Sequence, residues 1–304
     1  TIGCDKQGNA YNINGDIVGR ITFGKNIFSR SNNILVRENV CKMRMGYSAT
    51  ITTGNSVVDN GKPYCIVHNV ESFHEGDVVV INKNGEIIFL YEIASKHNAI
   101  MATERCNHRC IMCPQPPILQ ESDKTPFNIE LISLFDKSTE EIGITGGEPT
   151  LMNDLEEKLK VIKSLGFKVK LDTNGYRPDV LKKLINLNLI DYVAMDIKNS
   201  LEKYELTTGT INLQIEKIQE SINLLKSNVI PYEFRTTIVK EFHNEEDIKK
   251  ISHLIKGASK YYLQKFVSGE NCIEKDLNPI DKETALSFVE ILKNTIEKVE
   301  LRGY

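Results

Sequence analysis

The feature that most constrains the fold is a regular alternation of short apolar runs and amphipathic stretches, which begins near residue 98. Apolar runs bounded by polar turns are typical of buried strands, and apolar residues at helical spacing are typical of helices that cover a sheet. Such repetition predicts a parallel sheet with its helices outside. The predicted strands cover residues 98–103, 141–145, 167–171, 191–197, 232–239 and 260–266. The predicted helices cover residues 127–137, 154–166, 178–188, 212–226, 245–257 and 281–298.

The pattern amounts to about six βα units, which can form either an open, doubly wound sheet or a partial barrel. The stretch VELRG at 299–303 adds one more candidate strand. In both architectures, chemistry gathers at the C-terminal ends of the strands. Residues that directly follow the predicted strands are therefore the first candidates for a functional site.

The first 95 residues have a different texture. They are rich in Val, Ile, Thr, Asn and Gly, and they contain short strand-like pieces without a convincing helix. Residues 77–93 hold two β-rich runs around an Asn-Lys-Asn-Gly turn, which predicts a hairpin. We therefore predict a small β-rich domain over residues 1–95 and an α/β domain over residues 96–304.

The composition is that of an ordinary globular protein, with 304 residues and a formal net charge of −3. The small net charge gives no indication of a nucleic-acid partner or an anionic membrane surface. No apolar run approaches the roughly 20 residues that a transmembrane helix needs, and the polar start of the chain lacks the apolar core of a signal peptide. The cysteine count is seven, an odd number, which favours a reducing cytoplasm over a secreted disulfide framework. Four cysteines have no metal-like spacing and are expected to be buried thiols: Cys4, Cys41, Cys65 and Cys272.

The other three cysteines, Cys106, Cys110 and Cys113, lie close together directly after the first predicted strand. A helix with a cysteine stripe does not fit, because Pro114 and two further prolines follow. A structural zinc site would need four ligands, usually in paired Cys-x-x-Cys units, and His108 is the one further candidate ligand in this loop. A 4Fe–4S cluster normally takes four thiolates, so three thiolates would leave one iron open to a substrate.

The spacing Cys-x3-Cys-x2-Cys after the first strand of a βα barrel resembles the signature of the radical S-adenosylmethionine (SAM) superfamily. The resemblance implies a partial (β/α)6 TIM-like barrel and a 4Fe–4S cluster held by Cys106, Cys110 and Cys113. The open iron would bind the amino and carboxylate groups of SAM, and one electron would cleave SAM to a 5′-deoxyadenosyl radical that abstracts hydrogen. Met112 stands where many members carry an aromatic residue beside the adenine, and a thioether can also pack against a ring.

A second motif, GGEPT at 146–150, follows the strand predicted at 141–145. Two glycines at a strand end allow another group to approach the backbone closely, although such turns are also common between a strand and a helix. Downstream of the three cysteines, the motif resembles the glycine-rich SAM motif of the superfamily. This resemblance implies that Gly146, Gly147 and Glu148 hold the SAM ammonium group.

Polar residues also end the next two predicted strands. Asp172, Thr173 and Asn174 follow one strand, and Asp196 and Lys198 follow the other. The same residue types are typical of a capped turn and of an Asp–Lys ion pair. Adjacent parallel strands would bring Asp172 and Asp196 to the same mouth, where two carboxylates repel each other unless a cation or a lysine lies between them.

Arg235 is unexpected in a strand of a parallel sheet, which is normally apolar on both faces. Strand alternation places it on one face with Glu233 and Thr237. A buried arginine costs several kcal/mol unless it is paired. Arg235 is therefore expected either to pair with Glu233 or to reach an anionic ligand, and Gln264 is a similar inward candidate.

Residues 141–268 resemble the activating enzymes of anaerobic ribonucleotide reductase and related glycyl-radical enzymes. The resemblance rests on KLDTNGYRPDVLKKL, DYVAMDIKNSLEKY, YEFRTTIVKEFH and KYYLQKF. It implies that Asp172, Thr173 and Asp196 form a site for a monovalent cation, Na⁺ or K⁺, beside SAM. The residues implied to lie close to SAM are Thr173, Asn174, Lys198 and Arg235.

Residues 60–150 resemble instead the radical SAM maturases of the His-Xaa-Ser peptide systems, on GDVVVINKNGEIIFLY and HNAIMATERCNHRCIMCPQPP. Both groups act on a polypeptide, either a glycyl-radical enzyme partner or a short peptide. We therefore predict a cytoplasmic oxidoreductase with a polypeptide substrate, a reductant such as flavodoxin or ferredoxin, and residues 1–95 as a docking surface. The alternatives are a radical SAM enzyme that acts on a small molecule and a non-catalytic iron–sulfur electron carrier or sensor.

Overall fold

The computed structural model describes residues 6–24, 32–39, 46–54, 60–118, 124–269 and 271–304. By its internal contacts the chain divides into two compact units. The first contains Thr1–Ile100 and Thr125–Ile142, and the second contains Met101–Lys124 and Gly143–Tyr304. The functional division at residue 95 stays a prediction.

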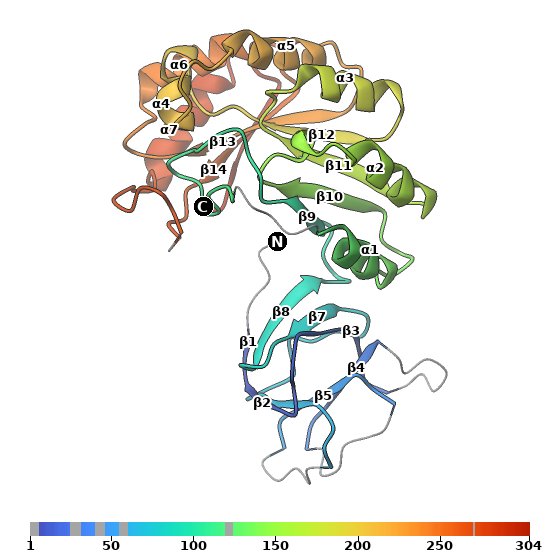
Figure 1. Cartoon of the computed structure of the whole chain (residues 1–304). Helices are drawn as coiled ribbons and strands as arrows, with labels where there is room; N and C mark the ends of the chain where they lie inside the picture. Colours follow the sequence, from blue (N-terminus) through green and yellow to red (C-terminus); the bar gives the residue numbers. More distant parts are fainter. Residues whose placement is uncertain (1–5, 25–31, 40–45, 55–59, 119–123, 270) are drawn as a thin grey trace. The chain divides into compact units, whose positions relative to one another are not determined.

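The strands of the N-terminal region form one sheet in the order β1-β8-β7-β3-β4-β5-β6-β2. The strands are β1 Lys6–Gln7, β2 Asn9–Tyr11, β3 Ile17–Thr22, β4 Asn33–Arg37, β5 Ala49–Thr52, β6 Tyr64–Ile66, β7 Val78–Ile81 and β8 Glu86–Tyr91. At the two ends of this order, β1 pairs with β8 and β2 pairs with β6, while only Gly8 separates β1 from β2. The two edges therefore meet along one stretch of chain, and the sheet closes into a small barrel (Figure 1).

The predicted hairpin is confirmed as the antiparallel pair β7 and β8. The side chain of Asn82 orders its turn, because Asn82 Oδ1 accepts hydrogen bonds from the backbone N–H groups of Asn84 (2.9 Å) and Glu86 (3.0 Å). Gly85 completes the turn at a φ of +83°, a backbone conformation that glycine adopts without steric cost. The hairpin register then sets which side chains of β7 and β8 face the interior.

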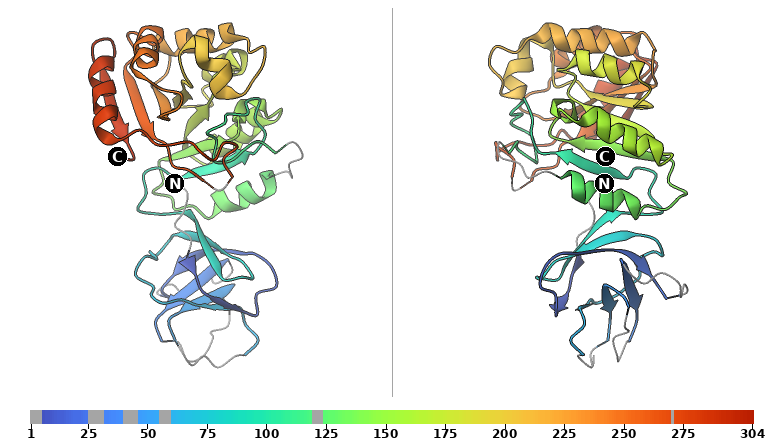
Figure 2. Two further views of the ribbon diagram at one scale, coloured as in Figure 1. Left: turned by 90° about the vertical axis from the view of Figure 1, so that its left-hand side faces the viewer. Right: turned by 45° about the vertical axis from the view of Figure 1, so that its right-hand side comes forward.

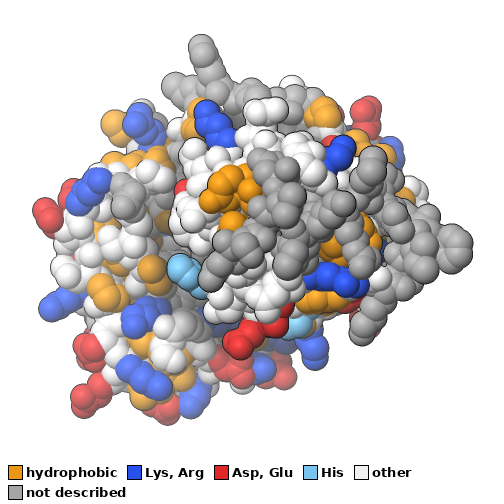
Figure 3. Space-filling view, turned by 90° about the horizontal axis from the view of Figure 1, so that it is seen from below, with side chains coloured by type: hydrophobic (Ala, Val, Ile, Leu, Met, Phe, Trp, Pro, Cys, Tyr) orange, Lys and Arg blue, Asp and Glu red, His pale blue; other side chains and the backbone are white. Residues whose placement is uncertain are grey.

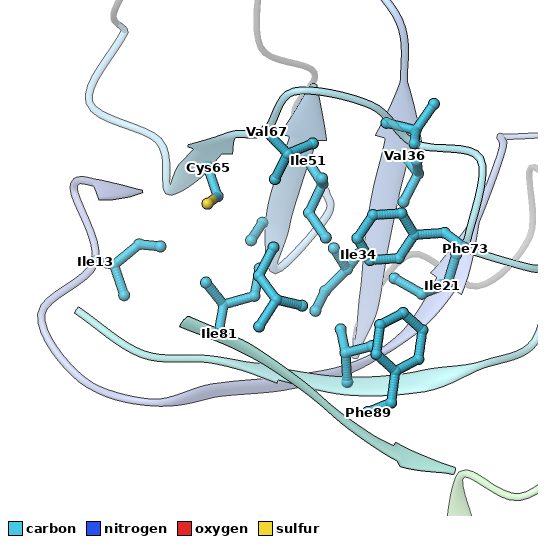
Figure 4. Close-up of a cluster of buried hydrophobic side chains, with 14 residues drawn as sticks. Ile13, Ile21, Ile34, Val36, Ile51, Cys65, Val67, Phe73, Ile81 and Phe89 are labelled. Atoms are coloured by element: carbon cyan, nitrogen blue, oxygen red, sulfur yellow. The ribbon is translucent and has the colours of Figure 1, made fainter. Parts of the chain in front are cut away.

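Aliphatic side chains fill the interior of this small barrel (Figure 4). Ile21, Ile34, Ile51 and Ile81 are fully buried, and the ring of Phe89 lies beside them in the same cluster. Full burial of each such side chain stabilises the fold by about 1.5–3 kcal/mol. The N-terminal region therefore has a hydrophobic core of its own.

Two of the four isolated cysteines lie in the described residues, and both are buried as expected. Cys65 belongs to the core of the small barrel, where burial raises the pKa of its thiol to about 11. Cys272 lies in a separate small cluster that also contains Met112. Cys4 and Cys41 lie outside the described residues.

The second sheet runs through seven strands of the described chain in sequence order, from β9 to β15. The strands are β9 Ala99–Thr103, β10 Glu141–Gly146, β11 Lys168–Thr173, β12 Tyr192–Asp196, β13 Tyr232–Ile238, β14 Lys260–Lys265 and β15 Lys298–Arg302. The pairs from β11 to β15 are parallel. This order, with a helix in each connection, is that of a partial barrel, so the predicted fold is confirmed and residues 299–303 do contribute a further strand.

Helices connect successive strands and lie outside the curved sheet (Figures 1 and 2). Leu155, Leu159 and Ile162 form the buried face of α2, at the spacing that a one-sided helix requires. The helices are α1 Thr125–Ser133, α2 Leu155–Ser164, α3 Pro178–Asn186, α4 Tyr204–Thr208, α5 Ile215–Lys226, α6 Glu245–Leu254 and α7 Lys282–Leu292, with the short 3-10 helices η1 Pro149–Leu151 and η2 Leu201–Lys203.

The structure differs from the predicted helices most clearly at α7, α4 and α1, while α5 begins and α6 ends three residues inside the predicted bounds. Helix α7 ends at Leu292 rather than at 298, because Lys298 already pairs with Lys260 in the sheet. Helix α4 was not predicted, since five residues are too few to show a periodicity, and Gly209 ends it at a φ of +58°. Helix α1 ends at Ser133 rather than at 137.

The segment after α1 packs within the first compact unit. Arg20 on β3 donates two hydrogen bonds to the carbonyl oxygen of Leu134, one of them at 2.9 Å from Nε. The ring of Tyr91 stacks on Phe135 with 4.4 Å between centroids. The segment 134–135 therefore belongs to the same compact unit as the N-terminal sheet.

The surface carries charges of both signs. On the face shown in Figure 3, Lys and Arg side chains are interspersed with Asp and Glu side chains, in keeping with the formal net charge of −3. Among the helices that the structure describes, none has the length and apolar character to cross a membrane.

Candidate active site at the mouth of the βα barrel

A cavity of about 230 Å³ lies at the C-terminal ends of β10 to β13 in the second unit. The loop that follows β9 and carries the three clustered cysteines contributes one side of it, and we call residues 104–118 the cysteine loop. The cavity brings together the predicted site residues Cys106, Cys110, Met112, Cys113, Gly146, Gly147, Asp172, Thr173, Asn174, Asp196, Lys198 and Arg235. Glu148 and the weaker candidate Gln264 do not line it.

The cysteine loop is not a regular helix, as its prolines predict. Cys106, Cys110 and Cys113 are all free thiols, and Cys110 is buried. A tight turn joins the last two, because the Cys113 N–H donates to the Cys110 carbonyl at 2.9 Å. The three thiols therefore stand on an irregular loop at the edge of one cavity, which is the arrangement expected for a shared inorganic ligand.

Amide groups surround the first cysteine. The backbone N–H of His108 donates to Cys106 Sγ at 3.4 Å, and Asn174 Nδ2 lies 3.9 Å from the same sulfur. Burial raises the pKa of Cys106 to about 11 and also raises the pKa of Cys110 and Cys113. The thiols are thus protonated at neutral pH until a metal displaces their protons.

Three other segments hold the cysteine loop in place. Asn174 Nδ2 donates to Asn107 Oδ1 at 2.8 Å, and the Arg109 N–H donates to the Thr208 carbonyl at 2.9 Å. The Glu274 N–H donates to the Ile111 carbonyl at 3.1 Å. The loop after β11, the end of helix α4 and the segment after β14 therefore each fix one part of the cysteine loop.

Met112 has two environments. Its side chain is 6% exposed and packs in a small cluster with Val239, Phe266, Cys272 and Leu277. It also lines the cavity. The packing shows a structural role for Met112 as an anchor of the cysteine loop, and its predicted contact with adenine stays a prediction.

Gly146, the last residue of β10, and Gly147 after it are required because the backbone at the end of β9 approaches them closely. A Cβ atom on Gly146 would lie 2.1 Å from the Thr103 carbonyl oxygen, and one on Gly147 would lie 2.2 Å from the Arg105 carbonyl oxygen. The two backbone segments are also joined by a hydrogen bond, because the Gly147 N–H donates to the Thr103 carbonyl at 2.7 Å. The sequence correctly predicted a close approach here, and the approaching group is protein backbone.

We expect Gly147→Ala to destabilise the βα barrel by about 3 kcal/mol, because a Cβ inside van der Waals contact with a backbone carbonyl forces the two strands apart. Urea unfolding followed by circular dichroism measures the change. Gly15→Ala is the matched control, because the space around Gly15 is open and its φ is not positive. Equal stabilities of the two variants would contradict the close approach.

Glu148 is turned away from the cavity and is fully buried. Its carboxylate accepts hydrogen bonds from Thr150 N (3.1 Å), Thr150 Oγ1 (2.6 Å), Thr173 Oγ1 (2.8 Å) and Asn174 N (2.6 Å). Burial raises the pKa of Glu148, and the four donors oppose this shift. Glu148 therefore ties the turn after β10 to the end of β11. Thr150, which the sequence did not single out, is part of the same network.

Four charged side chains form a chain across the cavity. Arg235 Nε donates to Asp196 Oδ1 at 2.9 Å, and Arg235 Nη1 donates to Asp172 Oδ2 at 3.2 Å. Lys198 Nζ donates to Asp196 Oδ2 at 2.9 Å. The two positive charges balance the two carboxylates. The predicted Asp–Lys ion pair is therefore present, and a guanidinium lies between the two aspartates.

The alternative that Arg235 pairs with Glu233 is wrong. Glu233 instead accepts two hydrogen bonds from Arg302 on β15, at 2.7 and 2.9 Å. Sheet register decides this, because Arg235 lies directly opposite Asp196 on the neighbouring strand. Arg302 was not considered as a partner, since β15 was only a candidate strand in the sequence.

Stability is expected to fall between about pH 4 and pH 2 through Asp196. Burial raises the pKa of this carboxyl, but the charges of Arg235 and Lys198 outweigh burial and lower it from 3.8 to about 2. The ionised carboxylate thus stabilises the folded state by about 2 kcal/mol at pH values above the pKa of the unfolded state. This stabilisation is lost as the pH falls through the pKa of the folded state. Urea unfolding at pH 5 and pH 3 is expected to show a smaller pH dependence for Asp196→Asn than for the wild type. An identical pH dependence would contradict the lowered pKa.

The cavity contains buried polar atoms that lack partners in the described part of the chain. They are Asp172 Oδ1 and both ring nitrogens of His108. Buried polar groups are nearly always satisfied, so such atoms indicate that a ligand completes the site. Three free thiols, an unpaired carboxylate oxygen and the charges of Lys198 and Arg235 fit an iron–sulfur cluster together with a ligand that carries amino and carboxylate groups.

The monovalent cation fits less directly. Thr173 Oγ1 donates to Glu148 and accepts from the Gly175 N–H, so its oxygen is already engaged. Arg235 already bridges Asp172 and Asp196. The site is therefore charge-balanced by protein groups, and the cation stays a prediction.

Several residues line the cavity that sequence reasoning did not assign to it. For Thr237 a signal was available, because it shares its strand face with Arg235. Gln264, the other inward candidate, does not line the cavity. The further lining residues are His108, Pro114, Gln115, Pro117, Thr145 and Ile197.

Comparison with known proteins agrees with this geometry. The model of the radical SAM superfamily matches residues 100–255. A Methanocaldococcus jannaschii protein, provisionally named a glycyl-radical enzyme activating enzyme, is 34% identical over 214 residues, which cover 68% of this chain and 89% of the relative. A GTP 3′,8-cyclase of Campylobacter jejuni subsp. doylei is 31% identical over 137 residues, or 42% of this chain and 39% of the cyclase. The chain thus spans well under half of the cyclase.

A solved structure, Streptococcus suis SuiB bound to S-adenosylmethionine, has a TM-score of 0.54 and 12% identity. The match covers 67% of this chain and 50% of that chain, and at this identity it shows the fold alone. The superfamily model and the archaeal relative both extend over more than half of the chain. This protein is therefore an enzyme of the radical SAM superfamily.

Proposed function

We propose that this enzyme abstracts a hydrogen atom from a polypeptide, with activation of a glycyl-radical enzyme as the first candidate. The observation that carries the proposal is the convergence of three free thiols and four charged side chains on one cavity. The archaeal relative, provisionally named as an activating enzyme and matched over 89% of its length, supports this substrate class. An electron carrier or sensor would not need the charged half of the cavity.

Cys106, Cys110 and Cys113 would hold a 4Fe–4S cluster with one iron left open, and SAM would bind at that iron. When bound, the cluster and SAM supply the one-electron chemistry that removes a hydrogen atom from the substrate. A reductant such as flavodoxin or ferredoxin would be needed to transfer an electron to the cluster. Substrate and reductant would both act at the open side of this cavity.

The charged side chains would orient SAM. Lys198 and Arg235 offer positive charge to a carboxylate, while Asp172 Oδ1 is an open acceptor for an ammonium or hydroxyl group. The ion pairs hold these groups in fixed positions before the ligand arrives. Such preorganisation lowers the cost of ordering the site when SAM binds.

We also propose residues 1–95 as a docking module for the polypeptide. The described strands of this region close into a barrel, so it would not bind a partner by strand addition at a sheet edge. Its side chains and loops would make the contact instead. This module precedes the match to the superfamily model, which begins at residue 100.

A small-molecule substrate is the second candidate, and the likeness to a GTP 3′,8-cyclase favours it. The likeness covers 42% of this chain.

The first test is anaerobic. The protein is reconstituted with iron and sulfide, mixed with SAM and dithionite, and assayed for 5′-deoxyadenosine beside a Cys106→Ala variant. Formation by the wild type alone is the expected result. A well-formed cluster that leaves SAM intact, with and without extract of the source organism, would favour the carrier or sensor.

The second test identifies the substrate class. An extract from cells grown on α-deuterated glycine is separated into macromolecules and metabolites, and each fraction is added to the reconstituted enzyme. Deuterium in 5′-deoxyadenosine from the macromolecular fraction would show abstraction from a glycine residue of a polypeptide. Deuterium from the metabolite fraction alone would overturn the proposal in favour of a small molecule.

A further inference from the structure

His108 is the least satisfied polar side chain of the cysteine loop. It lies between Cys106 and Cys110, and its side chain is buried, with the residue 1% exposed. Neither Nδ1 nor Nε2 has a hydrogen-bond partner among the residues that the structure describes. A buried N–H group without an acceptor costs about 1–3 kcal/mol. A phenylalanine or leucine would fill the same space without this cost, so the imidazole needs an explanation.

The ring of His108 is held in a fixed position. It meets the ring of Tyr176 edge-on, with 5.6 Å between centroids and 69° between planes. Tyr176 is itself fixed, since its hydroxyl accepts from the Gln214 N–H at 3.3 Å and Lys217 Nζ lies 4.8 Å from its ring centroid. The backbone N–H of His108 donates to Cys106 Sγ. The imidazole therefore lines the cavity from a rigid support beside the first predicted cluster ligand.

We propose that the imidazole of His108 donates an N–H hydrogen bond to a sulfur atom of the cluster held by Cys106, Cys110 and Cys113. The inference rests on the proposed function, because it needs a cluster in this loop. The imidazole always carries at least one N–H, and the group that both flanking cysteines would hold belongs in the same cavity that the imidazole lines. His108 is thus a positioning and tuning residue and is not a metal ligand.

Such a hydrogen bond would alter the redox behaviour of the cluster. Reduction adds negative charge to the cluster sulfurs, and a donor aimed at one sulfur stabilises the reduced state more than the oxidised state. The reduction potential therefore rises. The cluster of this enzyme would be easier to reduce than one in which an apolar side chain stands at position 108.

The test measures the cluster alone, without SAM. Wild-type protein, His108→Phe and His253→Gln are reconstituted anaerobically and titrated with a reductant while the reduced cluster is followed by electron paramagnetic resonance. His108→Phe keeps a ring against Tyr176 but removes the donor, and its midpoint potential is expected to shift downward. His253 is exposed on α6, and its variant is expected to titrate like the wild type.

A second measurement uses the wild type and does not depend on the folding of a variant. Protein in which only the imidazole nitrogens of histidine carry ¹⁵N is reduced, and electron–nuclear double resonance is recorded; this label leaves out the backbone N–H of His108, which donates to Cys106 Sγ. A weak ¹⁵N coupling, with an exchangeable proton and present without SAM, is expected in the wild type and in His253→Gln. It is expected to be absent in any His108→Phe protein that assembles a cluster.

Three outcomes would overturn the inference. An unchanged midpoint potential in a His108→Phe protein that carries a cluster would show that His108 makes no hydrogen bond to the cluster. A strong coupling would make His108 a ligand, and a coupling that appears only with SAM would make SAM its partner. Failure of the wild type to assemble any cluster would instead refute the proposed function on which the inference rests.

Discussion

Arg235→Met is expected to destabilise the βα barrel by about 3–5 kcal/mol, because it leaves two carboxylates in the cavity without their shared guanidinium. Arg235 donates to Asp172 and to Asp196, and its side chain is 12% exposed. Methionine keeps most of the volume, so the loss reflects charge rather than packing. Urea unfolding at pH 7 measures the difference.

The controls separate charge from shape. Arg177→Met breaks an exposed pair in which Arg177 donates two hydrogen bonds to Asp179, and it is expected to cost less than about 1 kcal/mol. Adding Asp172→Asn and Asp196→Asn to Arg235→Met is expected to recover part of the lost stability, because the repelling charges are gone. If the triple variant were less stable than Arg235→Met by the summed losses that Asp172→Asn and Asp196→Asn cause in the wild type, electrostatic coupling among these side chains would be refuted.

Replacement of any one of Cys106, Cys110 and Cys113 by alanine is expected to abolish 5′-deoxyadenosine formation and to lower the iron content of the reconstituted protein. Each cysteine supplies one of the three thiols that line the cavity, and the buried thiol of Cys272 is not among the groups that line it. Iron and sulfide analysis beside the product assay measures both effects.

The matched control is Cys65→Ala, a buried thiol in the core of the small β-barrel. This variant is expected to lose some stability through a cavity, yet to bind the same iron as the wild type. Full iron content in a Cys110→Ala variant, together with wild-type product formation, would contradict the assignment of the cysteine loop.

Much of this protein was accessible from the sequence because strand alternation and loop spacing are local properties. The repetition of apolar runs and helical stretches predicted the partial barrel. In any parallel sheet the C-terminal ends of the strands lie at the same edge. Cys106, Cys110, Gly147, Asp172 and Asp196 were therefore predicted to meet at one mouth, and the cavity contains them all. A functional motif whose position is fixed by backbone geometry can be recognised without knowing which side chains its residues bond to.

The partners of these side chains were decided only by the tertiary structure. Periodicity gives the face of a side chain, whereas the residue opposite depends on the register with the next strand. That register sets Asp196, and not Glu233, beside Arg235. It also leaves Glu233 to Arg302, from a strand 69 positions later in the chain.

The N-terminal region and the cavity show the same limit. The sequence indicated β-structure in residues 1–95, but closure of its sheet depends on β1 and β2 pairing with strands far along the chain. The hydrogen bonds of Glu148 to Thr150 and Thr173 had no signal in the sequence either. The sequence by itself determined the fold class and the residues of the mouth, and only the tertiary structure decided which of them bond to each other, because long-range register has no local signal.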